Sequence, residues 1–203
     1  MGSPPGALLP LEPRLQRPDP YFRIEGASCD PSRKEVVLEL RGSCHCGAVS
    51  FRVDSPMPYP YLACYCSICR KTAGGGGYAI NLGALSETLE VEGEEHLRVY
   101  NARLYDRGGP DEAETSPARR NFCAGCGSFL WVFDPRWPEL VHPFASAIDT
   151  PLPRPPEKVR IMLDSAAPWC EIPEEGAREH HFPEYPAESL EEWHRRRGLY
   201  EGS

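Results

Sequence analysis

Short apolar stretches alternate with polar turns along most of the chain, and their period is that of β-strands. Val49, Phe51 and Val53 alternate with Ser50 and Arg52, which is typical of a strand with one buried face. Further short strands are predicted at residues 35–40, 78–82, 89–91, 97–100, 129–133, 141–148 and 159–163. This pattern predicts a mainly β fold.

The first 34 residues lack this period and carry six prolines in their first twenty positions, so residues 1–34 are predicted to be an extended strap or a disordered tail. Residues 35–175 are then expected to form one domain, followed by a C-terminal extension of residues 176–203. An irregular, charged insert is predicted at residues 103–120, either as a solvated loop or as a lid over a site.

A single helix is predicted, at residues 186–197 of the C-terminal extension. Two opposite-charge pairs are expected there at helical spacing, Glu191 with Arg195 and Glu192 with Arg196. Gly198 is placed to end the helix.

Seven of the nine cysteines fall into three short groups, and this is the strongest chemical signal in the chain. The groups are Cys44 and Cys46, then Cys64, Cys66 and Cys69, then Cys123 and Cys126. Thiols one or two residues apart can turn their sulfurs toward one point. Zinc takes four such ligands in a structural site, and three with an open position in a catalytic one. Seven clustered cysteines therefore indicate two metal sites.

Two roles besides metal binding remain open for these cysteines. One is a thioredoxin-type redox pair at Cys66–Cys69 or Cys123–Cys126, although no βαβ pattern surrounds either pair. The second is structural disulfides, which are disfavoured because cysteines separated by one residue bridge poorly. Cys29 and Cys170 stand alone and are expected to be ordinary thiols.

Composition and charge exclude several classes of function. A net charge of −8 argues against a nucleic-acid surface, which requires clustered cations. No stretch is long and apolar enough for a membrane span, and no targeting segment is apparent, so a cytoplasmic protein is expected. The run Gly74–Gly77 matches no nucleotide-binding motif, and its expected role is to let the backbone pass close to a metal site.

Taken together, the cysteine motifs resemble those of the glutathione-dependent formaldehyde-activating enzyme family, which includes S-(hydroxymethyl)glutathione synthase and centromere protein V. The matching stretches are residues 42–49, 64–71 and 122–127, with weaker matches at 147–149 and 167–169. The resemblance spans about residues 40–172. It implies a β-tent, a fold of small antiparallel sheets around two zinc sites, with the predicted helix lying outside it.

Carried over residue by residue, the resemblance implies two Zn²⁺ ions per chain with different roles. The structural zinc would be bound by Cys44, Cys46, Cys123 and Cys126, and the catalytic zinc by Cys64, Cys66 and Cys69. The chain departs from the family at Arg160, where the family often has histidine.

Two cations follow the three-cysteine run directly, and they complete the predicted active site. Arg70 and Lys71 would either offset the thiolate charge or hold a substrate carboxylate. The predicted catalytic residues are therefore the three cysteines with Arg70. The predicted substrate-binding residues are Arg70, Lys71, Gly75 and Arg160.

Three functions remain open on the sequence alone. The first, implied by the resemblance, is a zinc-dependent carbon–sulfur lyase that joins or separates a small aldehyde and a thiol such as glutathione. The second is a zinc-dependent carbon–carbon lyase, a decarboxylase of a small acid, favoured by the departure at Arg160 and by the insert. The third is a zinc module that binds a partner without catalysis.

Overall fold

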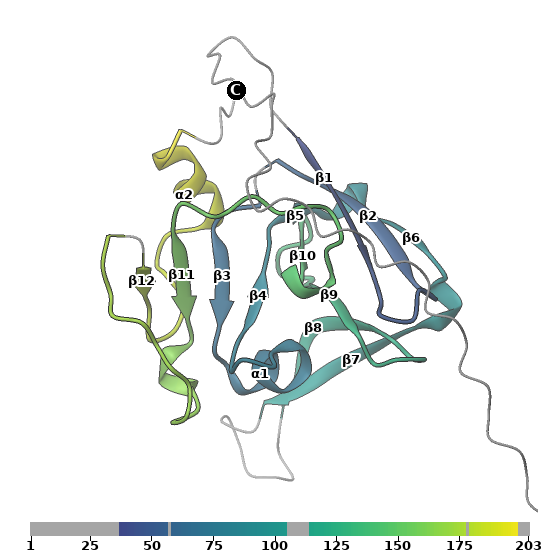
Figure 1. Cartoon of the computed structure of the whole chain (residues 1–203), viewed down its shortest axis with the longest axis horizontal. Coiled ribbons are helices and arrows are strands. Elements are labelled where there is room, and N and C mark those ends of the chain that lie inside the picture. The colour runs from purple at the N-terminus through teal and green to yellow at the C-terminus, as the bar shows by residue number, and fades with distance from the viewer. Residues whose placement is uncertain (1–36, 57, 105–113, 178, 199–203) are drawn as a thin grey trace, which may run out of the picture. The chain divides into compact units, whose positions relative to one another are not determined.

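The structure is a computed structural model that describes residues 37–56, 58–104, 114–177 and 179–198. Within these residues the fold is mainly β, as predicted, with three small sheets and two short α-helices (Figure 1). The predictions for residues 1–34 lie outside the described residues. None of the described helices is long and apolar enough to cross a membrane.

The three sheets are built as follows. The first has the order β1 (Leu38–Ser43), β2 (Ser50–Ser55), β6 (Glu90–Glu92). The second has the order β5 (Ala84–Leu85), β10 (Leu140–Pro143), β9 (Phe129–Phe133), β8 (Glu114–Cys123), β7 (Leu97–Leu104). The third has the order β12 (Glu179–His181), β11 (Lys158–Ile161), β3 (Tyr61–Cys64), β4 (Ala79–Asn81).

Strand pairing confirms the predicted antiparallel sheets in two of the three cases. The first two sheets are antiparallel throughout. The third is mixed, because β11 runs parallel to both β3 and β12 while β3 and β4 are antiparallel. Parallel neighbours need a long connection, and β3 and β11 are joined by most of the domain.

The β1–β2 hairpin shows how alternation along the chain separates the core from the solvent. Leu40 and Val53 lie opposite each other and are fully buried, and the ring of Phe51 packs edge-on against Trp131 with centroids 5.1 Å apart. These apolar side chains belong to the larger of two core clusters. Their polar sequence neighbours face outward, so the alternation in the sequence sets the register of the hairpin.

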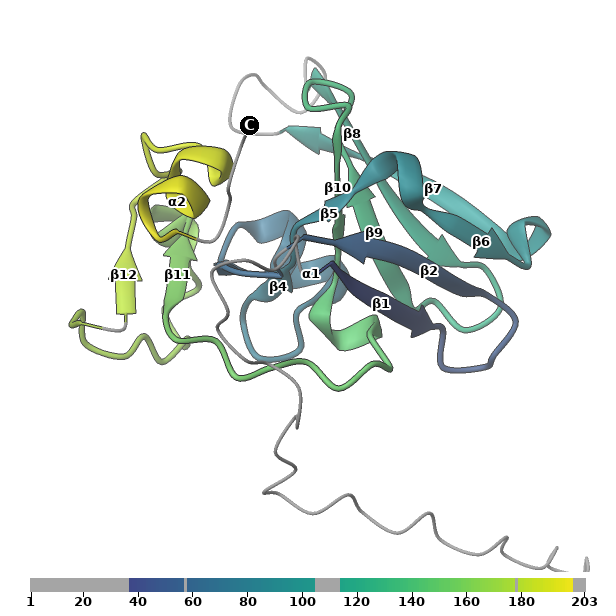
Figure 2. The same cartoon turned by 90° about the horizontal axis from the view of Figure 1, so that it is seen from above.

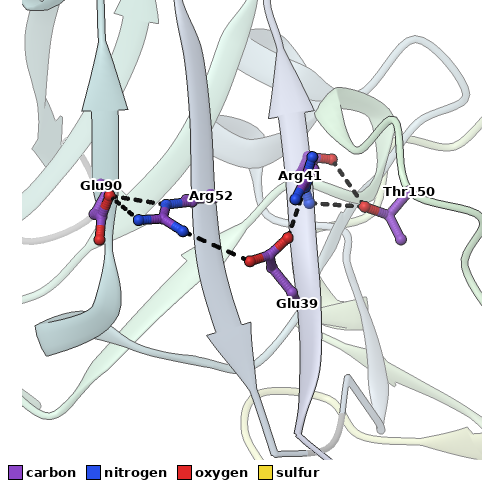
Figure 3. Close-up of polar contacts among 5 residues, drawn as sticks. All are labelled: Glu39, Arg41, Arg52, Glu90 and Thr150. Atoms are coloured by element: carbon purple, nitrogen blue, oxygen red, sulfur yellow. Dashed lines mark hydrogen bonds and ion pairs between the residues drawn. The ribbon is translucent and has the colours of Figure 1, made fainter.

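Polar contacts cover the outer face of this sheet, as Figure 3 shows. Arg52 contacts a glutamate on each neighbouring strand. Its Nε donates to Glu90 Oε2 at 2.8 Å, and its Nη1 lies 3.8 Å from Glu39 Oε2. Arg41 contacts Glu39 and donates its backbone N–H to Thr150 Oγ1 at 2.8 Å. The exposed ion pairs contribute little to stability. The Thr150 contact, in contrast, joins the hairpin to the segment after β10.

The predicted irregular insert is wrong over the residues that the structure describes. Arg103 and Leu104 end β7, and residues 114–120 begin β8. The strand was missed because its inward side chains are not bulky and apolar: Ser116, Ala118 and Arg120 are buried, and an exposed Pro117 interrupts them. The predicted strand at residues 141–148 also ends early, at Pro143, and residues 145–147 form a 3₁₀ turn.

The C-terminal helix is confirmed but is shorter than predicted. α2 (Leu190–Arg196) begins after Ser189, whose side chain forms a capping box with Glu192. The Glu191–Arg195 pair is present, whereas the predicted Glu192–Arg196 pair is wrong, since Glu192 caps the helix and Arg196 contacts Glu188. Gly198 follows with a φ of +62°. Both views place α2 beside β11 (Figures 1 and 2).

A second helix, α1 (Ser67–Ala73), was not predicted. It lies beside the end of β4 in both views (Figures 1 and 2). It is only seven residues long and carries two of the seven clustered cysteines at or near its start, so its apolar period is too brief to be recognised.

Candidate functional site

Four of the clustered cysteines meet in space although they come from distant parts of the chain. Cys44 and Cys46 lie in the β1–β2 turn, Cys123 ends β8, and Cys126 lies in the turn between β8 and β9. Their sulfurs all lie within 4.8 Å of one another. We call this set the four-cysteine group. It joins the first sheet to the second.

The separations within this group fit a tetrahedral metal. A Zn–S bond of about 2.3 Å in a tetrahedron places neighbouring sulfurs about 3.8 Å apart. The Cys44 and Cys46 sulfurs are 3.5 Å apart, and those of Cys46 and Cys123 are 3.7 Å apart. Four thiols at this spacing form a closed donor set that could hold a metal ion.

The two turns that supply these ligands have the same backbone design. The Cys44 amide donates to Val49 at 2.9 Å, and the Cys123 amide donates to Ser128, also at 2.9 Å. Each turn is completed by a glycine with a φ of +74°, Gly47 in one and Gly127 in the other. The second turn also provides a hydrogen bond to one of the thiols, since Ser128 Oγ lies 3.2 Å from the Cys126 sulfur. Hydrogen bonding from Ser128 lowers the pKa of Cys126 to about 5.

The remaining three cysteines form a second group at the junction of β3 and α1. Cys64 ends β3, Cys66 is the N-cap of α1, and Cys69 lies in its first turn. Their sulfurs also lie within 4.8 Å of one another. The Cys69 amide donates to the Cys66 sulfur at 3.3 Å. We call this set the three-cysteine group, and it too could hold a metal ion.

The three thiols affect one another's ionisation in a way that suits a cation. Hydrogen bonds from Cys64 and then Cys69 lower the pKa of Cys66 to about 2. The pKa of Cys64 is raised, first by its hydrogen bond to Cys66, because a second thiolate would face the first in a buried site. A divalent cation placed among the three sulfurs would remove this penalty and allow all three to ionise.

A cavity of about 420 Å³ opens from the three-cysteine group. Polar side chains from three further elements line it: Asn81 from β4, Arg120 from β8 and His142 from β10. Tyr185, an exposed side chain of the C-terminal extension, also lines the cavity. A three-thiol centre with a cavity beside it is the arrangement expected of a reactive metal site.

Comparison with known proteins identifies the family. The family model described as glutathione-dependent formaldehyde-activating enzyme matches residues 39–163, more than half of the chain. The chain belongs to this family. A curated protein of Halomonas elongata, provisionally named a glutathione-dependent formaldehyde-activating enzyme, is 60% identical over 163 residues. The alignment covers 80% of this chain and 99% of that protein.

A solved structure was also matched, that of a protein from Rhodobacter sphaeroides. It is 28% identical, covers 56% of this chain and 92% of its own, and superposes with a TM-score of 0.42. The family match covers both cysteine groups, so the protein is an enzyme of the formaldehyde-activating family with two candidate metal centres.

Arg70, Lys71 and Gly75 come together, but not at the three-cysteine group. They line a different cavity of about 650 Å³, together with His45 near the four-cysteine group. Among the described residues, no residue lines both cavities. A helix turns by about 100° per residue, so residues that directly follow Cys69 in α1 leave its face of the helix.

The fourth residue of the predicted substrate site, Arg160, lines neither of these two cavities. It is 4% exposed, its Nε donates to Glu179 Oε2 at 2.8 Å, and its Nη1 donates to the Tyr65 hydroxyl. These two contacts within the protein join β11 to β12 and to Tyr65, the residue after β3.

Sequence reasoning missed the polar residues that do line the cysteine cavity. Asn81, Arg120, His142 and Tyr185 lie in unrelated parts of the chain and belong to no spacing motif. For Arg120 one signal existed: a cation at an inward position of an alternating strand, two residues before an apolar Phe122 and a cysteine.

Proposed function

We propose that the protein catalyses the reversible addition of glutathione to formaldehyde at a zinc ion bound by Cys64, Cys66 and Cys69. The observation that carries this proposal is the convergence of three buried or half-buried thiols beside a cavity of about 420 Å³. The family match and the provisional name of the Halomonas elongata relative supply the substrates.

The reaction is balanced without an oxidant or a reductant. The sulfur of glutathione forms a bond to the formaldehyde carbon, the carbonyl π bond opens toward oxygen, and the thiol proton ends on that oxygen. Zinc bound by three thiolates would supply one open coordination position and Lewis acidity for this addition. In reverse, the same step breaks a carbon–sulfur bond, which is the lyase direction.

His142 is the residue we assign to handling the thiol proton. Its Nδ1 lies 3.1 Å from the Leu82 carbonyl oxygen, which can only accept, so the ring hydrogen is on Nδ1. Nε2 is then left as an acceptor, and His142 lines the cysteine cavity. Burial lowers the pKa of this histidine, which keeps the ring neutral and able to accept a proton.

The four-cysteine group is assigned to a second, structural zinc. Its donor set has four thiols, which leaves no position for a substrate. The protein would therefore hold two zinc ions per chain. A cytoplasmic location stays a prediction that rests on the free thiols.

Neither alternative function gains an observation from the structure. The decarboxylase hypothesis rested on Arg160 and on the insert, but Arg160 has its partners within the protein and the described ends of the insert are strands. A zinc module without catalysis would not need a cavity at its second metal site.

The test measures formation of S-(hydroxymethyl)glutathione from ¹³C-formaldehyde and glutathione by NMR, with and without enzyme. Wild type should accelerate the reaction and contain two zinc ions per chain by elemental analysis. Cys66→Ser should retain one zinc and lose the acceleration. Cys170→Ser removes a half-buried thiol that belongs to neither group, and it should behave as wild type. A wild-type protein with two zincs and no acceleration would overturn the proposal.

A further inference from the structure

Arg120 is a buried cation, and most of its side-chain donors lack partners within the described part of the chain. It lies on β8, is 7% exposed, and is one of the few charged residues in the interior. Neither its Nε nor its Nη1 has a hydrogen-bond partner among the residues that the structure describes. Burial of an unpaired guanidinium is costly, and buried charges in proteins are normally paired.

A second buried arginine shows what a purely structural role requires. Arg160 is buried to a similar degree as Arg120, and its side chain donates hydrogen bonds to Glu179 and to the Tyr65 hydroxyl. Asp134, a buried acid that lines the same cavity as Arg120, is already occupied by Arg136 through two contacts of 3.0 and 2.6 Å. Arg120 is therefore left with donors that no described residue around it accepts from.

Arg120 also lines the cavity of the three-cysteine group, together with Cys64, Cys66 and Cys69. A ligand whose sulfur approaches the three-cysteine group would bring its neighbouring groups within reach of this guanidinium. Glutathione carries two carboxylates on either side of its thiol, and a planar guanidinium is the preferred partner of a carboxylate.

We propose that Arg120 positions the thiol substrate by binding one of its carboxylates. The proposal rests on the proposed function for the identity of the substrate. It assigns to Arg120 the role that the sequence pattern had suggested for Arg70 and Lys71, which line the second cavity. Arg120 does not touch the reacting atoms, so it is a positioning residue.

A purely structural role for Arg120 makes different predictions. If Arg120 served only to offset the thiolate charge, its loss would weaken zinc binding and would affect charged and uncharged thiols alike. If it binds a carboxylate, its loss leaves the zinc in place and affects only ligands that carry a carboxylate. Removal of an unpaired buried charge should also not lower the stability of the ligand-free protein.

The experiment measures binding of glutathione and of glutathione diethyl ester to the zinc-loaded protein by isothermal titration calorimetry. Arg120→Gln should weaken glutathione binding about 10- to 100-fold, the range expected for hydrogen bonds to a charged group. Binding of the ester should be weak and the same in both proteins. Arg119→Gln removes the same charge from the exposed face of the same strand, and it should bind glutathione as wild type does.

One further variant keeps the result decisive. Arg120→Lys keeps the charge without the planar fork and should recover part of the affinity, which also covers the case of an unfolded Arg120→Gln. Unchanged glutathione affinity in Arg120→Gln, or loss of zinc with equal effects on both ligands, would overturn the proposal. Absence of catalysis in wild type, with glutathione affinity still dependent on Arg120, would instead overturn the proposed function alone.

Discussion

The two cysteine groups offer the same chemical donors but differ in how the chain assembles them. The four-cysteine group joins two hairpin turns that are 77 residues apart at Cys46 and Cys123, and two of its members, Cys46 and Cys126, are exposed. The three-cysteine group is contained in six consecutive residues, and Cys64 and Cys69 are buried.

From this difference we expect the four-cysteine group to stabilise the fold and the three-cysteine group to carry the chemistry. A metal in the four-cysteine group would close a long loop and hold the first sheet against the second, so its binding free energy would become folding free energy. The three-cysteine group is local, and Cys64 is paired in its sheet with Ala79 and Ile161. We therefore expect the fold there not to depend on a metal. A site that the fold maintains by itself can leave a coordination position open.

The largest expected effect is the difference in stability between a variant that lacks one cysteine of the four-cysteine group and a variant that lacks one cysteine of the three-cysteine group. Cys123→Ser should unfold or aggregate, because structural zinc contributes on the order of 10 kcal/mol and whole domains are stable by about 5–15 kcal/mol. Cys66→Ser should remain folded with one zinc. Circular dichroism melting curves and elemental analysis of both variants test this. Similar losses of structure in the two would remove the distinction between the groups.

A smaller effect should appear at two glycines beside the four-cysteine group. Both Gly93 and Gly127 have positive φ, +77° and +74°. A Cβ on Gly93 would overlap the Ala48 carbonyl oxygen in the first turn, whereas one on Gly127 would meet nothing within 4 Å.

Gly127→Ala should therefore cost about 1–2 kcal/mol through backbone strain alone. Gly93→Ala adds a backbone clash and should cost about 3 kcal/mol or more. Urea unfolding in excess zinc measures both. Equal costs would mean that the first turn moves away without penalty, and that the four-cysteine group is less rigid than its geometry indicates.

The smallest effect concerns the pH response of the cavity beside the three-cysteine group. Burial lowers the pKa of His142 below its ordinary value of 6.5. Below pH 6.5 the unfolded chain then binds a proton at this position that the folded chain does not, so stability should fall as the pH drops through that value.

Nitrogen-15 NMR of the imidazole should show a neutral ring with its hydrogen on Nδ1 at pH 6.5. The dependence of unfolding free energy on pH should flatten in His142→Gln, which cannot be protonated. A His142 ring that is half protonated at pH 6.5, or a hydrogen on Nε2, would contradict the assignment of His142 as the acceptor beside the three-cysteine group.

Local features of this protein could be predicted from its sequence because short segments carry them completely. Alternation at Val49, Phe51 and Val53 predicts the β1–β2 hairpin, since the side-chain period of a strand is two. The apolar run at 129–133 predicts β9 with its correct bounds. The cysteine spacings predict two converging groups, because a tight turn suffices to direct neighbouring sulfurs to one point.

The remaining features depend on contacts between segments that are far apart in the sequence. β8 was missed because its inward face is made of Ser116, Ala118 and Arg120, and those residues are recognised as buried only once β7 and β9 flank them. The parallel pairing of β3 with β11 likewise depends on how the residues between these two strands fold, because that fold brings β11 back beside β3.

Adjacency in the sequence was also a poor guide to which cation lines the cavity of the three-cysteine group. Arg70 follows Cys69 directly, but rotation along α1 directs it to another cavity, while Arg120 arrives at the three-cysteine group from a different sheet. The spacing of the cysteines accounts for the thiols that gather within each turn, because a few bonds are enough to bring neighbouring sulfurs together. The pairing of Cys44 and Cys46 with Cys123 and Cys126 was implied by the family resemblance and not by the spacing. Which charged side chain lines their cavity depends on the tertiary structure, because the burial of Arg120 and the lack of described partners for its Nε and Nη1 come from everything packed around it.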